Sequence, residues 1–228
     1  MNKELADEIN TETRLIDYYA RRAPEYEQIY HRPERQQDLR KLEQLVAQAF
    51  CGLDVLEIAC GTGYWTQFIA KQARSVLATD YSAEVIDIAR DKDYTPCTVS
   101  FVESDAYSLT NIEGTRSAGF LGFWWSHIPK SKLSIFIKAL HSQLDDYALV
   151  LVIDNNRYVE GNSLPVSRHD AEGNTYQKRR LTDGSEYEIL KNFPTKAGLV
   201  EQLTPYADDI EIELLTYYWL ATYRVTKR

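Results

Sequence analysis

The sequence predicts an α/β fold in three layers, in which helices cover both faces of a mostly parallel sheet. From Leu53 onward, short apolar segments alternate with amphipathic ones, which is typical of strands joined by crossover helices. Strands are expected at Asp54 to Ala59, Ser75 to Thr79, Thr98 to Val102, Ser117 to Phe123 and Ala148 to Ile153. Helices are expected at Trp65 to Ala73, Ala83 to Asp91 (capped by Ser82) and Lys130 to Leu144.

Further elements flank this alternation. Helical patterns precede it at Glu4 to Arg22 and Pro33 to Phe50, and a hairpin with strands Thr175 to Leu181 and Glu186 to Phe193 interrupts it. A helix at Lys196 to Leu203 and two strands within Ile210 to Thr226 follow. One domain is therefore expected over residues 1–228, with a helical lid (1–50), a core (51–154), a polar loop with the inserted hairpin (155–194) and a terminal helix with strands (195–228).

The composition narrows the classes of function. A net charge of -8 and a pI near 5.1 would repel a phosphate backbone, so nucleic acid is not an expected partner. No apolar run approaches the roughly 18 residues of a membrane span, and no apolar signal core follows Met1. Three cysteines without metal-ligand spacing indicate free thiols and no metal site. A cytoplasmic protein, monomeric or homodimeric, is the expectation.

A glycine turn carries the chemistry. The segment Val55 to Trp65 is a buried strand that enters a turn containing Gly61 and Gly63, and glycine lets a backbone approach a ligand closely. Asp80 ends the next strand, where a carboxylate can accept both hydroxyl hydrogens of a ribose. A nicotinamide dinucleotide would require a third glycine where Thr66 stands. The turn and the acidic Glu57 instead favour a ligand that carries an ammonium and a carboxylate.

With these residues the sequence resembles the class I S-adenosylmethionine (SAM)-dependent methyltransferases, whose turn is acid-x-Gly-Cys-Gly-Thr-Gly; Ala59 replaces the first glycine. The resemblance implies the family's Rossmann-like fold with a seven-stranded sheet, SAM as methyl donor, S-adenosylhomocysteine as product, and no metal. It implies that Ala59 and Gly61 hold the methionine end and Asp80 the ribose, while Tyr81 packs on the adenine. Asp105 and Ala106 would contact the adenine amino edge. The remaining residues expected to contribute to the cofactor site are Tyr19, Glu57, Gly63, Trp65 and Trp124.

The acceptor side is expected after the fourth strand, at Trp124 to Pro129. In this fold the position of His127 faces the acceptor, where an imidazole can act as a base or hydrogen-bond an anionic oxygen. A histidine at a helix start with a satisfied hydrogen bond is the structural alternative. Trp125 is expected to lie in the core.

The hairpin offers two pairing registers around Asp183 and Gly184. A two-residue primed turn places Arg180 opposite Tyr187, whereas a bulged three-residue loop places Arg179 there. In either register one arginine shares a face with Lys191 and has no carboxylate opposite it. Such cations suit a carboxylate, phosphonate or phosphate, although a solvated sheet face is the structural alternative.

A narrower resemblance, to the small phosphonate O-methyltransferases of dehydrophos-type biosynthesis, favours Arg179 and the bulged register. It is carried by Tyr18, Tyr19, Glu25 and Tyr26, by Gly61 to Thr66, by Trp124, His127 and Pro129, and by Arg179 to Gly184 with Lys191. It implies that Tyr19 and Tyr26 close over the site while His127, Arg179 and Lys191 grip an anionic small-molecule acceptor. The competing interpretations are an N- or C-methyltransferase of an uncharged metabolite, a SAM-binding protein without turnover, and a nicotinamide-dependent dehydrogenase.

Overall fold

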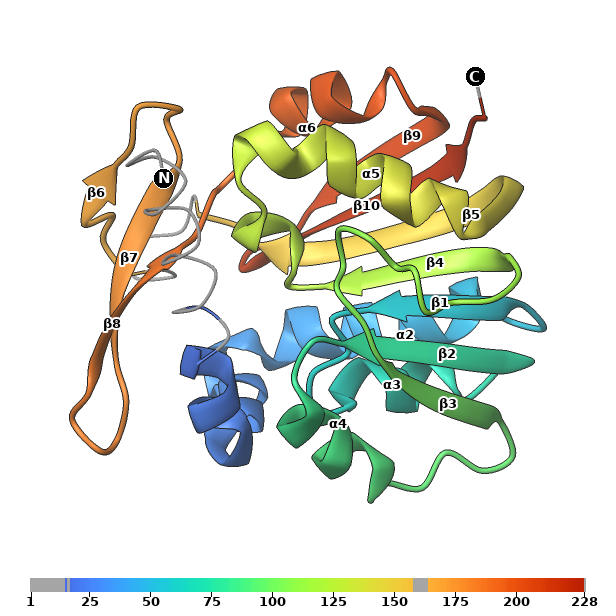
Figure 1. Ribbon diagram of the computed structural model, residues 1–228, viewed down its shortest axis with the longest axis horizontal. Helices are drawn as coiled ribbons and strands as arrows, with labels where there is room; N and C mark the ends of the chain where they lie inside the picture. The colour runs from blue at the N-terminus through green and yellow to red at the C-terminus, as the bar shows by residue number, and fades with distance from the viewer. Residues whose placement is uncertain (1–14, 16, 158–163, 228) are drawn as a thin grey trace.

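A seven-stranded sheet with helices on both faces forms the body of the molecule (Figure 1). The computed structural model describes residue 15, residues 17–157 and residues 164–227. In spatial order the strands are β3 (Thr98–Glu103), β2 (Ser75–Asp80), β1 (Asp54–Ile58), β4 (Arg116–Gly122), β5 (Leu144–Asn155), β10 (Tyr218–Val225) and β9 (Ala207–Leu214). Strands β1 to β5 are parallel, and β10 is antiparallel to both of its neighbours. This arrangement confirms the predicted fold class.

Two apolar cores lie on opposite faces of the sheet, because successive side chains of a strand point to opposite faces. On β1, Val55 contributes to one core with α2 (Gln36–Ala49) and α3 (Tyr64–Ile69). The next residue, Leu56, contributes to the other core with α5 (Leu133–Ser142) and α6 (Lys196–Leu203). A further helix, α4 (Ala83–Arg90), packs against β2 and β3. Helices therefore bury both faces, as near-continuous apolar strands require.

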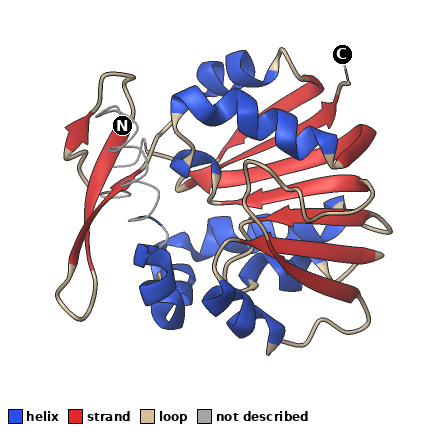
Figure 2. Ribbon diagram, in the orientation of Figure 1, coloured by secondary structure: helices blue, strands red, loops and turns tan. Residues whose placement is uncertain are grey.

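A second sheet stands apart from the first (Figure 2). It contains β7 (Thr175–Arg180) and β8 (Glu186–Leu190), which form the predicted hairpin, and the short β6 (Arg168–His169), which was not predicted. Arg179 pairs with Tyr187 and Arg180 with Glu186, and Gly184 has a φ of 86°. The register is therefore the bulged one.

The chain before β1 is helical but not in the predicted form. Leu15 and residues 17–22 are helical, while the earlier part of the helix predicted at Glu4 to Arg22 lies outside the described residues. Next come the 3₁₀ helices η1 (Ala23–His31) and η2 (Pro33–Arg35), of which η1 was not predicted. Thr62 in the glycine turn donates a hydrogen bond of 2.7 Å to Glu27 of η1. Tyr30 stacks on Tyr64 with ring centroids 3.7 Å apart.

Several element boundaries differ from the prediction. The helix predicted to continue to Leu144 ends at Ser142, and Leu144 instead begins β5. The hydroxyl of Ser82 makes no capping hydrogen bond to α4, because it donates to the Glu84 carboxylate at 2.6 Å. Two further 3₁₀ turns, η3 (Trp125–His127) and η4 (Lys130–Lys132), follow β4. Among the described residues, no helix has the length and apolar character needed to cross a membrane.

Candidate functional site

A cavity of about 320 Å³ opens where β1 to β4 end. Parallel strands place their carboxyl ends at one edge of a sheet, and ligands of open α/β sheets bind in the crevice there. Four chain segments after these strands contribute to the wall, and Leu15, Tyr19, Tyr26 and Leu190 close it from the N-terminal segment and the hairpin. The predicted site residues in the wall are Tyr19, Tyr26, Ala59, Gly61, Asp80, Tyr81, Asp105, Ala106, Trp124 and His127.

The glycine turn has the open geometry that a ligand requires. A Cβ atom placed on Gly61, whose φ is 54°, would meet no protein atom within 4 Å, so the space beside it faces the cavity. Ala59 adopts a φ of 53°, a left-handed conformation that costs a residue with a side chain about 1–2 kcal/mol. Strain of this kind persists where the surroundings hold the backbone in place. Ala59 therefore holds a left-handed conformation that a glycine at this position would adopt more easily.

The Asp80 side chain is held by backbone N–H groups of the loop after β1 and of the loop after β2. Its carboxylate accepts N–H bonds from Gly61 at 2.9 Å and from Ser82 at 3.0 Å. Burial raises the pKa of Asp80, although these backbone hydrogen bonds oppose the rise. Since each carboxylate oxygen has two lone pairs, Asp80 can still accept hydrogen bonds from a hydroxylated ligand.

Three residues expected at the cofactor site do not line this cavity. Glu57 lies on the face of β1 that α3 covers, where it accepts a hydrogen bond of 2.7 Å from Thr66 and burial raises its pKa to about 8. Gly63 has a φ of 79° and faces α4, where an added Cβ would lie 3.0 Å from the Cβ of Ala89. Trp65 is buried in the core with α2 and α3. Alternation along β1 and helix packing explain these positions better than ligand contact does.

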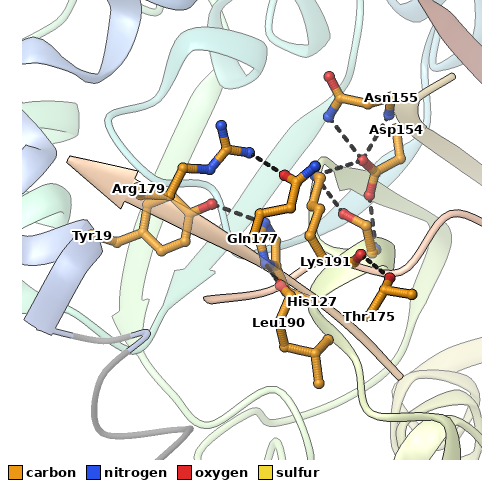
Figure 3. A network of polar contacts seen from close by, with 10 residues as sticks. Tyr19, His127, Asp154, Asn155, Thr175, Gln177, Arg179, Leu190 and Lys191 are labelled. Carbon is orange, nitrogen blue, oxygen red and sulfur yellow. Dashed lines mark hydrogen bonds and ion pairs between the residues drawn. The ribbon is translucent and has the colours of Figure 1, made fainter. Parts of the chain in front are cut away.

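The acceptor end of the cavity is built around His127. Its Nδ1 lies 2.7 Å from the Leu190 carbonyl of β8, and its Nε2 lies 2.8 Å from the Tyr19 hydroxyl (Figure 3). Burial and then the charge of Lys191 lower the pKa of His127 to about 3, against the opposing effect of Asp154. The imidazole is therefore neutral at pH 7 and is held between the N-terminal segment and the hairpin.

The prediction that Lys191 is an unneutralised cation was wrong. Its ammonium lies 3.1 Å from the Asp154 carboxylate and donates to the Ser126 hydroxyl at 2.6 Å, and it does not line the cavity. Lys191 stands one residue beyond β8, at the base of the hairpin, where it meets the end of β5. Pairing within the hairpin could not reveal this partner. Asp154 was not predicted as the partner of Lys191, because in the sequence it is only a polar residue at the end of an apolar strand.

Arg179 has no carboxylate partner among the described residues. Its side chain is half-buried, its Nη2 donates to the Gln177 amide oxygen at 2.7 Å, and its Nε is buried without a hydrogen bond. Figure 3 shows the Arg179 guanidinium directed toward Gln177, with Tyr19 nearby, and Arg179 is not among the residues that line the cavity. Burial lowers the pKa of Arg179, but a guanidinium remains charged at neutral pH. Nearby, the guanidinium of Arg22 lies 5.4 Å from the ring centre of Tyr26.

The N-terminal segment joins the cavity wall to the hairpin. The Tyr187 hydroxyl donates to Asp17 at 2.8 Å, and Thr182 donates to Glu25 at 2.6 Å. Glu27, which accepts from the glycine turn, also forms an ion pair with Lys92. The segment thus lies over the cavity and contacts both sides of it. Within the described ranges no group of three or more His, Cys, Asp or Glu side chains is arranged to hold a metal ion.

Comparisons with known proteins agree with this geometry. Residues 55–146 match the model of a family described as "Methyltransferase domain". The structure is similar to a "DhpI-SAH complex structure", with 28% identity, 96% of this chain and 98% of that chain covered, and a TM-score of 0.77. It is also similar to a "DhpI-SAM-HEP complex", with 26% identity, 94% and 97% covered, and a TM-score of 0.77.

More distant similarity supports the fold alone. The PH0226 protein from Pyrococcus horikoshii OT3 is 18% identical, with 86% of this chain and 92% of that chain covered and a TM-score of 0.68. No curated protein sequence matches the chain significantly.

Proposed function

Because the chain is a class I SAM-dependent methyltransferase, we propose that it O-methylates a small acidic metabolite with a carboxylate or phosphonate group. The observation that carries the proposal is Arg179, a half-buried guanidinium beside the acceptor end without a carboxylate partner among the described residues. A charge removed from water is costly unless it is paired, and an anionic acceptor would supply the partner. The similarity to the DhpI complexes supports the same class of acceptor.

The cavity residues fit the donor. The space beside Gly61 would receive the methionine end, with Ala59 contributing its strained backbone. Asp80 would accept from the ribose, and Tyr81, which lines the cavity and is 55% exposed, would cover the adenine. Asp105 and Ala106 would meet the adenine amino edge. Trp124 also lines the cavity, and its buried Nε1 has no hydrogen-bond partner in the described structure.

The acceptor would bind between Tyr19, Tyr26 and His127, with Arg179 behind Tyr19. SAM supplies a methyl carbon made electrophilic by its sulfonium. The residues of this chain therefore need only align the acceptor oxygen and exclude water. We propose that the N-terminal segment acts as the lid that does so, since Tyr19 and Tyr26 close the cavity. Lys191 would orient the acceptor end through its bonds to Ser126 and Asp154 without contacting the cavity.

A screen of matched acids, methyl esters and amides, with S-adenosylhomocysteine formation as the readout, tests this function. We expect turnover with acids only. We also expect Arg179→Gln to raise the acceptor KM about 10- to 150-fold, the equivalent of a hydrogen bond to a charged group. Arg180→Gln is the matched control, because Arg180 is exposed and pairs with Glu186 across the hairpin.

Two outcomes would reject the proposal. Equal turnover of acids and neutral analogues would favour an N- or C-methyltransferase of an uncharged metabolite. Binding of S-adenosylhomocysteine without turnover of any compound in the screen would favour a SAM-binding protein that does not catalyse transfer.

A further inference from the structure

The hydrogen bonds of His127 fix the position of its proton. A carbonyl oxygen can only accept, so the Nδ1 that lies 2.7 Å from the Leu190 oxygen carries the hydrogen. In a neutral imidazole the other nitrogen is then an acceptor. The Tyr19 hydroxyl, 2.8 Å from Nε2, must therefore donate to His127.

This orientation determines what the pair can offer to an acceptor. Once the Tyr19 hydroxyl has donated its hydrogen to His127, only oxygen lone pairs of Tyr19 face the cavity. An ionised oxygen placed there meets a second acceptor and forms no hydrogen bond. If Tyr19 turned its hydrogen toward the anion, the buried lone pair of Nε2 would lose the donor that the described residues provide, which is unfavourable in the interior.

The surrounding charges make one additional proton acceptable when an anion binds. The charged groups that act on His127 are Lys191 at the base of the hairpin, Asp154 on β5 and Arg179 on β7, while Arg22 of the N-terminal segment lies over the ring of Tyr18. Burial, the charge of Lys191 and the charge of Arg179 lower the pKa of His127 and disfavour a protonated imidazole in the free protein, while Asp154 opposes them. A bound anion adds a negative charge beside Tyr19, which favours the protonated imidazole.

We propose that the Tyr19–His127 pair admits an acidic acceptor only together with one proton. The inference rests on the proposed function and identifies the bound form of its substrate. The proton comes from solvent and lies on the chain of hydrogen bonds that joins the acceptor oxygen, Tyr19 and His127. During transfer the acceptor oxygen forms a bond to the methyl carbon, and the carbon–sulfur bond breaks with its electron pair moving to sulfur. The uncharged ester no longer holds the proton, which returns to solvent.

Calorimetry of the protein loaded with S-adenosylhomocysteine tests this inference. Propionate and methanesulfonate are suitable probes, because both are fully ionised between pH 6.5 and 8.5 and bring no titration of their own. We expect the uptake of one proton per anion, measured from the binding enthalpy in two buffers with different protonation enthalpies. We also expect Kd to rise about tenfold for each pH unit. A Kd independent of pH with no buffer dependence would overturn the inference.

Two variants identify the groups involved. In His127→Gln an amide N–H replaces the Nε2 lone pair with a permanent donor, so binding should become independent of pH. In Tyr19→Phe the imidazole remains, and proton uptake should persist. Proton uptake that is unchanged in His127→Gln would also overturn the assignment.

The acceptor screen distinguishes failure of this inference from failure of the proposed function. If acids are methylated but their binding takes up no proton, only this inference fails. If neither probe binds and no acid is methylated, the proposed function fails with it.

Discussion

Removing one member of the buried ion pair between Asp154 and Lys191 should destabilise the fold more than removing both. The two side chains are 0% and 6% exposed, and their charged atoms lie 3.1 Å apart. The pair joins the base of the hairpin to β5, and its bonds to Ser126 join it to η3, which carries His127. The informative variants are Asp154→Asn, Lys191→Met and the double substitution.

The expected loss of unfolding free energy in each variant depends on the contacts that remain to the unpaired charged side chain. Loss of one partner of a buried pair costs about 3–5 kcal/mol. After Lys191→Met, Asp154 still accepts backbone N–H bonds from Ser126 and Asn155, so we expect a loss of about 3 kcal/mol. After Asp154→Asn, the lysine can escape by losing its proton, which for an ordinary pKa of 10.4 costs about 5 kcal/mol at pH 7. The double variant leaves no buried charge and should lose less than about 2 kcal/mol.

Urea unfolding of the four proteins at pH 7 measures these losses. The loss in Asp154→Asn should also shrink as the pH rises toward 10. An unpaired buried lysine has a depressed pKa in the folded state, so the unfolded chain binds the extra proton and unfolding is favoured less at high pH. Additive losses in the double variant would refute the reasoning. So would a loss in Asp154→Asn that stays constant with pH.

Three further predictions concern the glycine turn and its surroundings. Asp80→Asn should weaken S-adenosylhomocysteine binding about 10- to 100-fold in calorimetry, as the loss of hydrogen bonds to a charged group implies, whereas the exposed Asp87→Asn should not. Burial raises the pKa of Glu57 to about 8 in the folded protein, so the unmutated protein loses stability as pH rises from about 4.5 to 8. Glu57→Gln should therefore stabilise the protein at pH 9 by a few kcal/mol and leave its stability unchanged at pH 4. Ala59→Gly should raise the free energy of unfolding by about 1 kcal/mol by relieving a φ of 53°, and an unchanged midpoint in urea would contradict this.

The sequence was sufficient where local pattern determines structure. Apolar runs separated by helices predicted β1 to β5, and right-handed crossovers then leave few possible strand orders. The turn at Gly61 and the acid at Asp80 were found together because consecutive parallel strands end at one edge. The hairpin register could be narrowed to two choices because the turn at Asp183 and Gly184 fits two loop types, which differ by one residue in pairing.

The remaining features depend on contacts between distant residues. The η1 helix is held by the bond from Thr62 to Glu27 and by the stacking of Tyr30 on Tyr64, and no helical periodicity within residues 23–31 predicts either. Lys191 finds its counter-ion 37 positions earlier in the chain. Glu57 was expected at the ligand because it stands beside the turn, but strand alternation turns it toward α3.

The ion pair between Lys191 and Asp154 limits which residues can select the class of acceptor. If Lys191 were free, two cations on the hairpin would attract any anion, and the state of His127 would matter little. With Lys191 held by Asp154, the hairpin keeps a half-buried guanidinium without a carboxylate partner among the described residues, that of Arg179, near a neutral imidazole whose lone pair is already occupied by Tyr19. Charge at Arg179 then attracts the acid, and the hydrogen-bond polarity of His127 decides the protonation state in which it binds. Substitution of Arg179 should therefore mainly lower the affinity for the acid, whereas substitution of His127 should abolish the pH dependence of binding.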